Sequence, residues 1–277
     1  MQLAIDHVPV AWSDLDEVRA EFERLGFAPE FGGEHDNGVT HMAVVGFPDR
    51  SYVELIAAKP DDPGPHFPFW PDHVLGDGGP AAWCVRVDDA AEEAKRLIDA
   101  DVPVSGPWYG TRDRDDGTLV EWDRVEFGDD ATRQVLPFAI ADRTPLEYRV
   151  PETESSGPFG GVGAVVVAVP DLEGAVDLFR RAYRIPRPVV DDRPDYGATV
   201  AGVPGRPLFL AEPHDGSWLA DRLDRFGPGP CACLLAADDL DAVGDEHPVG
   251  DPESWPTGRV AWFETEMLDR QLGVLAR

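Results

Sequence analysis

The chain contains little lysine, little cysteine and no long apolar run. Lys59 and Lys95 are the only lysines in 277 residues, so 22 of the 24 basic residues are arginines. The three cysteines, Cys84, Cys231 and Cys233, are too few for a disulfide framework, and we expect them to pack in the core. No segment approaches the roughly 20 apolar residues of a membrane-spanning helix, and the sequence does not open with a basic and then apolar leader. We therefore expect a cytoplasmic protein without membrane partners.

Acidic residues dominate the charge. The 53 Asp and Glu residues, 34 of them Asp, give a net charge of −29 at pH 7. A negative field of this size repels phosphate backbones, which argues against nucleic-acid binding. The charge is spread along the whole chain, and short carboxylates in place of lysine stems are typical of extreme halophiles. Because molar salt screens such self-repulsion, we expect a halophilic protein whose stability depends on salt.

An internal repeat organises the sequence. Residues 5–31 predict a strand, an N-cap at Asp14 and an amphipathic helix that ends at Gly26. A predicted β-hairpin follows, with strands at 40–47 and 51–58. This βαβββ pattern returns at 161–213 and, more weakly, in the segments between and after these two copies.

Four units of about 60 residues predict an α+β protein of two domains. We place the first domain at 1–150 and the second at 162–277. The polar stretch 151–161 is the expected linker.

Three short motifs in the first unit point to a family. They are Ile5-Asp6-His7, Gly38-Val39-Thr40-His41 and Glu54-Leu55-Ile56, and the second unit adds Leu136-Pro137-Phe138. With the paired βαβββ units, these motifs resemble the glyoxalase-like proteins of the vicinal oxygen chelate superfamily, which includes glyoxalase I, antibiotic-resistance proteins and extradiol dioxygenases. The resemblance implies two glyoxalase-like domains whose curved mixed sheets form cups. In the second domain it extends to the fold only, because Phe209 occupies the position analogous to Glu54.

The resemblance places two metal ligands, His7 and Glu54, on the first and last strands of the first unit. Strand alternation favours this for Glu54, since Val53 and Leu55 would then face the helix layer. If the hairpin turns tightly, with Val45 opposite Glu54, His41 points inward as well. We therefore take His7, His41 and Glu54 as candidate ligands of Mn, Fe, Ni or Zn, or Glu54 and His41 as a catalytic acid-base pair.

The second unit offers substrate-binding groups in place of ligands. We expect Tyr109, Arg112, Arg114 and Trp122 to contact a small-molecule substrate, because an arginine beside aromatic walls suits an organic acid. The usual second-unit ligands are missing from Ala82-Trp83 and Pro137-Phe138, which weakens the metal hypothesis. The remaining histidines lie in Gly-, Pro- and Asp-rich segments and are expected at the surface, namely His35, His66, His73, His214 and His247.

Two functions follow from this pattern. The first is an enzyme, whether lyase, isomerase or dioxygenase, that acts on a vicinal-oxygen, keto or enol compound. The second is a metal-free protein that binds or sequesters a small molecule in the same cup. The second domain then completes the fold or supports a homodimer. Sequence motifs of phosphate loops, dinucleotide-binding turns and serine-hydrolase elbows are missing.

Overall fold

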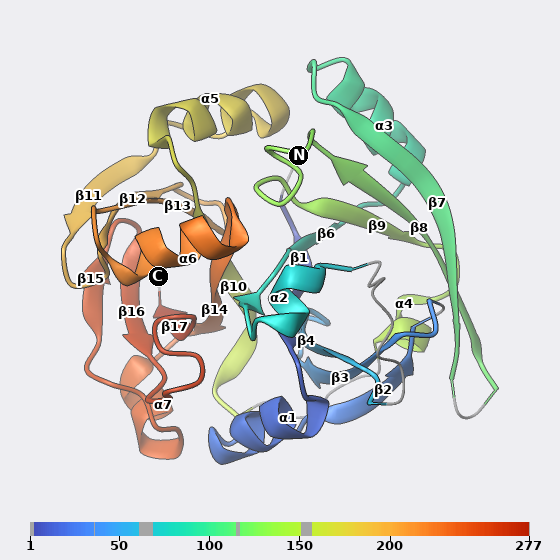
Figure 1. Ribbon diagram of the computed structural model, residues 1–277, viewed down its shortest axis with the longest axis horizontal. Helices are drawn as coiled ribbons and strands as arrows, with labels where there is room; N and C mark the ends of the chain where they lie inside the picture. The colour runs from blue at the N-terminus through green and yellow to red at the C-terminus, as the bar shows by residue number, and fades with distance from the viewer. Residues whose placement is uncertain (1–2, 36, 61–68, 115–116, 151–156, 277) are drawn as a thin grey trace.

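The computed structural model describes residues 3–35, 37–60, 69–114, 117–150 and 157–276. The described part of the first half forms one mixed sheet in the order β2-β3-β4-β1-β6-β9-β8-β7, with the short β5 paired to β1 (Figure 1). Its elements are β1 (Ile5–Trp12), α1 (Leu15–Arg24), β2 (Glu30–Glu34), β3 (Thr40–Gly46), β4 (Tyr52–Ala58), α2 (Pro71–Leu75), β5 (Gly79–Pro80), β6 (Cys84–Arg86), α3 (Ala90–Ile98), β7 (Val104–Asp113), β8 (Leu119–Phe127), β9 (Phe138–Asp142) and α4 (Leu146–Arg149).

The second half repeats this arrangement in the order β11-β12-β13-β10-β14-β17-β16-β15. Its elements are β10 (Phe159–Ala168), α5 (Leu172–Tyr183), β11 (Val189–Arg193), β12 (Ala198–Gly202), β13 (Leu208–Pro213), α6 (Trp218–Phe226), β14 (Gly229–Ala237), α7 (Leu240–Glu246), β15 (Glu253–Trp255), β16 (Gly258–Trp262) and β17 (Leu272–Ala276). Each half contains two βαβββ units, which confirms the predicted α+β fold of four repeated units. Among the described residues, no helix is long and apolar enough to cross a membrane.

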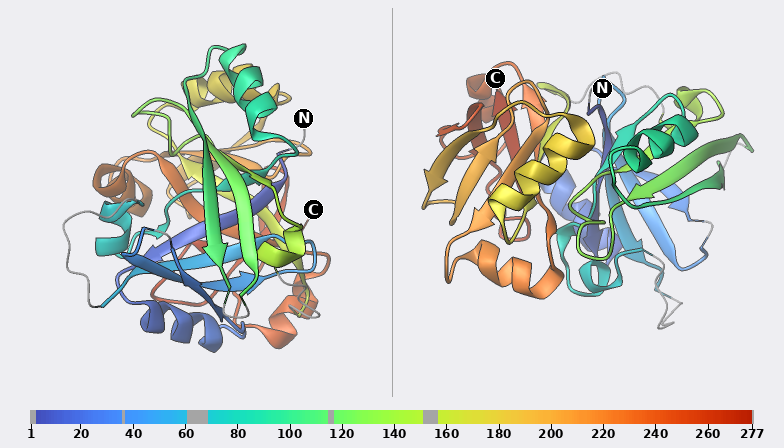
Figure 2. Two further views of the ribbon diagram at one scale, coloured as in Figure 1. Left: turned by 90° about the vertical axis from the view of Figure 1, so that its right-hand side faces the viewer. Right: turned by 90° about the horizontal axis from the view of Figure 1, so that it is seen from above.

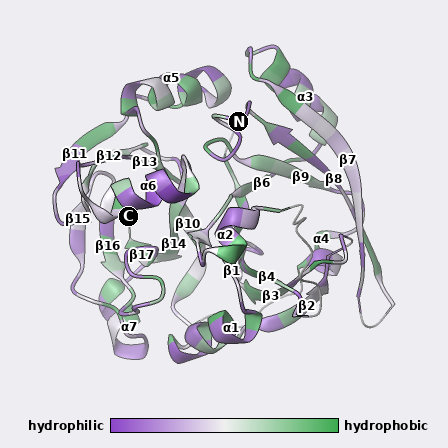
Figure 3. Cartoon of the chain, in the orientation of Figure 1, coloured by the Kyte–Doolittle hydropathy of each residue, from purple (hydrophilic) through white to green (hydrophobic). Residues whose placement is uncertain are grey.

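The first helix of every unit begins in the same way. Asp14, Asp89, Asp171 and Asp239 are the N-caps of α1, α3, α5 and α7, and each carboxylate accepts one or two hydrogen bonds from main-chain N–H groups of the first turn. This contact satisfies donors that a helix start otherwise leaves unpaired. Each of these helices carries both hydrophobic and hydrophilic residues (Figure 3). The local signals that predicted these helices are therefore the ones that form them.

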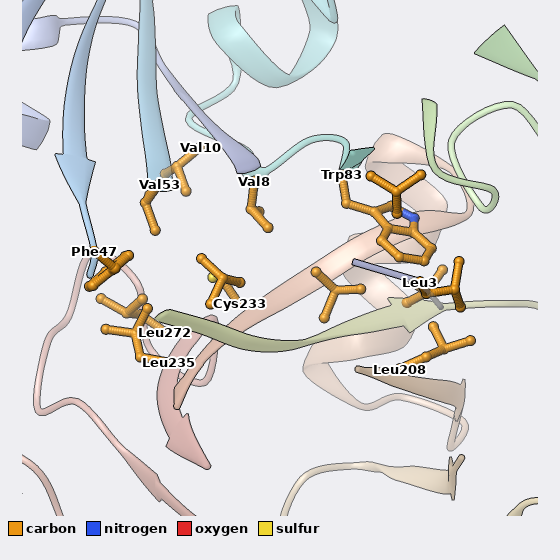
Figure 4. Packing of buried hydrophobic residues seen from close by; sticks show 14 of the residues in the cluster. Leu3, Val8, Val10, Phe47, Val53, Trp83, Leu208, Cys233, Leu235 and Leu272 are labelled. Atoms are coloured by element: carbon orange, nitrogen blue, oxygen red, sulfur yellow. The ribbon is translucent and has the colours of Figure 1, made fainter. Parts of the chain in front are cut away.

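The two halves lie side by side and share one core (Figures 1 and 2). Val8 and Val53 of the first sheet belong to the same buried cluster as Cys233 and Leu272 of the second (Figure 4). All three cysteines are buried and free, as expected. The outer faces of both sheets are apolar and cover one another in this cluster.

Polar contacts reinforce the junction between the halves. Arg222 of α6 is buried and donates to the main-chain oxygens of Gly78 and Pro80 in the first half. His247, at the end of α7, contacts the Leu25 oxygen through Nδ1 at 2.8 Å. These bonds satisfy buried carbonyl groups that would otherwise lose hydrogen-bonding to water.

Aromatic side chains fill the interior of the second cup. Tyr196 stacks on Trp262 with ring centroids 5.3 Å apart, and Phe209 meets the edge of Trp255 at 5.2 Å. Ala164 and Val166 of β10 are buried in the same cluster. The second cup is therefore a hydrophobic core.

Candidate functional site

The first cup contains a cavity. It opens to solvent, and its empty space together with that open mouth amounts to about 710 Å³. Polar, aromatic and aliphatic side chains from both units line it, namely His7, Glu34, His35, Met42, Tyr52, Glu54, Ile56, Phe69, Trp70, Thr111, Arg112, Trp122, Arg124, Phe138, Ile140 and Arg149. A concave site with a few convergent charged groups and aromatic walls is the usual form of a small-molecule site.

One wall of the cavity brings together a carboxylate and two imidazoles. Glu54 lies in the middle of β4 and is 6% exposed. Its Oε1 is 2.9 Å from Nε2 of His35, and its Oε2 is 3.5 Å from Nε2 of His7. Strand alternation works as predicted here, since Tyr52, Glu54 and Ile56 line the cavity while Val53 and Leu55 enter the shared core.

The other nitrogen of each imidazole has a protein partner. His7 Nδ1 is 2.8 Å from Asp6 Oδ1, and His35 Nδ1 is 2.8 Å from Thr40 Oγ1. A β-bulge between Ile5 and His7 interrupts the pairing of β1 with β6. Such a bulge changes the direction of a side chain, which lets the neighbouring Asp6 and His7 contact each other. Both histidines are thereby oriented with Nε2 toward Glu54.

Hydrogen bonding and nearby charges stabilise the ionised form of Glu54. Burial alone would raise the pKa of this carboxyl group, but the hydrogen bond from His35 and the charges of His35, His7 and Arg112 outweigh it, so the pKa lies below its usual value. Glu54 is therefore a carboxylate at neutral pH.

A buried ion-pair network contacts His7 through Asp6. Arg149 of α4 binds Asp6 through two parallel contacts of 2.7 and 2.8 Å and binds Asp142 of β9 at 2.6 Å. Arg86 adds a contact of 2.7 Å to Asp6. Although burial would raise the pKa of Asp6, Arg149 and the His7 hydrogen bond hold it well below its usual range. Asp6 therefore stays ionised and fixes the orientation of the His7 ring.

The opposite wall comes from β7 and β8. Arg112 and Trp122, two of the expected substrate contacts, both line the cavity. The indole of Trp122 lies against Gly110 of the neighbouring strand, where a Cβ atom would approach Trp122 Nε1 to 2.6 Å. Glycine at this position leaves room for the indole to approach the neighbouring strand closely. Arg124, which the sequence analysis did not select, also lines the cavity and lies over the rings of Phe69 and Trp108.

His41 lies outside the cavity, because the expected hairpin register was wrong by one residue. Val44, and not Val45, is opposite Glu54, and five residues (47–51) connect β3 to β4. A shift of one residue turns every side chain of β3 to the other face. His41 therefore lies on the face of Ala43 and Val45, which enter the shared core. Burial lowers its pKa, and its Nε2 has no hydrogen-bond partner among the described residues.

Two predicted substrate contacts also lie elsewhere. Tyr109 is 54% exposed and donates to Glu121 at 2.6 Å, on the outer side of β7. Arg114 follows β7 and donates to the Tyr148 oxygen at 3.1 Å. Neither residue lines the cavity. Alternation along β7 turns Tyr109 to the face opposite Arg112, whereas Arg114 lies beyond the end of the strand.

Three histidines expected at the surface are inside the protein. His35 belongs to the site, and His73 and His247 are buried at the junction between the halves. His214 is half-buried beside Asp192, and His66 lies outside the described residues. The sequence does not indicate His35 as a site residue, because Gly32-Gly33 within β2 obscures the strand pattern that leads to it. The main-chain N–H of His35 bonds to the Thr40 oxygen at 3.0 Å, which extends the β2–β3 ladder up to the histidine.

A second group of possible ligands, Asp6, His7 and Cys84, lies within 4.8 Å. Burial and the charge of Asp6 raise the pKa of the Cys84 thiol well above its usual value, which disfavours its thiolate form. Both Asp6 oxygens are already bound by Arg149. The set His7, His35 and Glu54 offers better donors, since its imidazole Nε2 atoms and its carboxylate face the cavity.

The structure is similar to solved structures along its whole length. A hypothetical protein from Staphylococcus aureus has a TM-score of 0.64 and 14% identity, covering 99% of this chain and 98% of that one. A mutant of 4-hydroxymandelate synthase from Streptomyces coelicolor has a TM-score of 0.58 and 16% identity, covering 100% of this chain and 94% of that one. 2,2',3-Trihydroxybiphenyl 1,2-dioxygenase from Sphingomonas wittichii has a TM-score of 0.54 and 15% identity, covering 100% of this chain and 91% of that one.

The sequence itself matches one family. No functionally curated protein matches it. The model of the glyoxalase-like domain matches residues 5–183, which include both units of the first half and His7, His35 and Glu54. Because the match covers more than half of the chain, the protein belongs to the glyoxalase-like domain family.

Proposed function

We propose that the protein is a metal-dependent enzyme of the glyoxalase-like type, which acts on a small molecule with a keto, enol or hydroxy group. One observation carries the proposal. In the first cup, two imidazole Nε2 atoms and a buried carboxylate converge at 2.9 and 3.5 Å on the wall of a cavity. Two histidines and one carboxylate form a common ligand set for divalent transition metals.

The surroundings of the three donors fit a metal site. Metal-binding histidines usually donate their second ring N–H to a carboxylate or another acceptor, which fixes the tautomer. Asp6 is such an acceptor for His7, and Thr40 is the corresponding partner for His35. Glu54 remains ionised for the reasons given above, so it offers a charged oxygen ligand. His35 takes the place that the sequence analysis gave to His41.

Each residue then has a defined part. His7, His35 and Glu54 would hold the ion, and Asp6 and Thr40 orient the two rings. A divalent ion supplies a Lewis acid that polarises a carbonyl or enol oxygen. Tyr52 and Phe138 pack against the His7 ring, with centroids 4.6 and 5.4 Å away, and limit the access of water to it. Lyase, isomerase and dioxygenase reactions all begin from such an arrangement, and fold alone does not choose among them.

Elemental analysis of protein purified in high salt without chelator tests the proposal. Wild type, Glu54→Gln, His35→Gln and the control His41→Gln are exposed in turn to Mn, Fe, Ni and Zn and then dialysed. We expect near-stoichiometric metal in wild type and in the control, and loss of metal in the two site variants. Metal should also raise the melting temperature of wild type and of His41→Gln only, because a ligand that binds the folded state stabilises it.

Turnover is the second measurement. Metal-loaded wild type should convert at least one member of a panel of 2-oxo acids, dicarbonyls and catechols, and Glu54→Gln should convert none. Wild type that holds no metal after exposure to all four ions overturns the metal-dependent function. Ligand-induced stabilisation without turnover by the loaded protein would instead indicate a binding protein.

A further inference from the structure

Arg112 is a half-buried cation that no carboxylate of the described residues contacts directly. Its Nη1 donates to the Gly32 oxygen at 3.1 Å and its Nη2 to the Arg149 oxygen at 3.2 Å. Its Nε is buried and has no hydrogen-bond partner among the described residues. No carboxylate in the described parts of the chain lies within 4.0 Å of it, although acidic residues outnumber basic ones by 53 to 24. A desolvated charge of this kind is costly unless something pairs with it.

The other cations of the cavity are already neutralised. Arg149 is paired with Asp6 and Asp142, as described above. Arg124 is paired with Glu126 at 3.1 Å. Burial lowers the pKa of Arg112, yet a guanidinium remains protonated at any ordinary pH. Among the arginines of the described lining, Arg112 is therefore the one without a carboxylate in direct contact.

The walls beside Arg112 are aromatic and apolar. Trp122 from β8, Phe138 from β9, and Phe69 and Trp70 before α2 line the same cavity. The ring centroids of Phe69 and Trp70 lie 5.6 Å apart, and those of Trp70 and Phe138 lie 6.3 Å apart. Aromatic rings at such distances form a surface on which a flat apolar group packs well.

We propose that the substrate is a planar organic acid whose single carboxylate pairs with Arg112 and whose apolar body packs against these aromatic walls. The inference rests on the proposed function and names its substrate class. A guanidinium matches the two oxygens of a carboxylate. A doubly charged phosphate fits less well, because Glu34 and Glu54 line the same cavity and would repel its second charge.

Binding of a matched pair of probes tests the charge requirement. 2-Naphthoate and 2-naphthamide have nearly the same shape and differ in charge. Isothermal titration calorimetry on chelator-treated wild type should show 2-naphthoate binding about 10- to 100-fold more tightly, as expected when a charged hydrogen-bonded pair is formed. Equal affinity for the two probes, or no binding of either, overturns the proposal. This comparison needs no variant, so a folding defect cannot obscure it.

Arginine variants then locate the contact. Arg112→Met should abolish the preference for naphthoate, and Arg112→Lys should restore part of it. Arg180→Met removes an exposed arginine of α5, whose side chain is 61% exposed, and should leave the preference unchanged. A preference that survives in a folded Arg112→Met protein contradicts the assignment.

Metal binding separates this inference from the proposed function. Arg112→Met should still hold stoichiometric metal, because it leaves the three donors in place. Glu54→Gln should lose metal but keep the preference for naphthoate, since the variant removes a negative charge near the anion. If Glu54→Gln loses metal and shows no preference for naphthoate over naphthamide, the acid-binding inference alone is refuted. A naphthoate preference in a protein that never binds metal refutes the proposed function alone.

Discussion

The two cups of the molecule have the same strand order, but charged side chains line the first and apolar side chains fill the second. Glu54 of the first cup lies opposite Pro9 of β1, and Phe209 of the second lies opposite Val166 of β10 at the corresponding position. Counting back from the helix N-caps Asp14 and Asp171, Ala164 likewise stands where His7 stands in the first cup. The second cup is closed by aromatic packing, whereas the first keeps a cavity lined with charges.

This difference shows that the βαβββ scaffold does not itself make a site. The backbone supplies a concave surface, and the inward side chains decide whether it becomes a core or a pocket. Burying charge in the first cup is costly, and the Asp6–Arg149–Asp142 network offsets that cost. The second cup needs no such network, because its inward groups are apolar. The first cup should therefore depend on electrostatics and the second on packing.

The largest effect should come from Asp6→Asn. This change leaves Arg149 and Arg86 facing a neutral amide in the interior, and breaking a buried pair costs up to about 5 kcal/mol. Urea unfolding at constant salt measures it. Asp142→Asn is the control, because Arg149 then keeps Asp6 as a partner, and it should cost clearly less. If Asp6→Asn unfolds at nearly the wild-type urea concentration, the first cup does not depend on its network.

Phe209→Ala should have the next largest effect. Phe209 is fully buried against Trp255, and truncating a buried phenylalanine to alanine costs about 3–5 kcal/mol through lost burial and a cavity. Metal content should not change. The matched variant in the first cup, Glu54→Gln, should cost less than about 1 kcal/mol, because the amide oxygen can still accept from His35. A larger loss for Glu54→Gln than for Phe209→Ala would reverse the contrast between the cups.

A smaller effect should appear at the junction of the halves when the pH falls. Burial, together with the charge of Arg222, lowers the pKa of His73 to about 3. The unfolded chain binds this proton below about pH 6.5 and the folded protein does not, so stability is full above pH 6.5 and decreases by about 1.4 kcal/mol per pH unit below it. Lowering the pH to 5 should therefore remove about 2 kcal/mol through this group.

The variant His73→Gln tests this by comparing melting temperatures at pH 7 and pH 5. The variant should lose less stability than wild type between the two values. His214→Gln, which changes a half-buried histidine beside Asp192, serves as the control. Identical pH dependence in wild type and His73→Gln would show that His73 is protonated in the folded protein.

Local signals predicted much of the fold and part of the site. The aspartate N-caps and the apolar spacing of the helices lie within a few residues of each other, so the sequence displays them directly. Glu54 was predicted for a similar reason, because alternation along β4 decides which side chains face the cavity.

Contacts between distant segments could not be predicted in the same way. Arg149 is 143 positions from Asp6, and no local pattern links them. His35 reaches Glu54 only because a short strand with a bulge at Phe31–Gly33 pairs with β3. The exclusion of His41 depends on a hairpin register that differs from the expected one by one residue. Such details follow from the length of a turn and the packing of both faces, which the sequence does not display locally.

The smallest effect should come from Tyr109→Phe, which tests how sharply the first cup is bounded. Tyr109 is close to Arg112 in sequence but points to solvent, where it contacts Glu121 and lies 5.1 Å from the Arg143 guanidinium. Exposed contacts of this kind contribute little, so stability should change by less than about 0.5 kcal/mol. Metal content and naphthoate affinity should equal those of wild type, whereas Trp122→Leu should weaken naphthoate binding. A loss of naphthoate affinity in Tyr109→Phe would mean that the outer face of β7 belongs to the site.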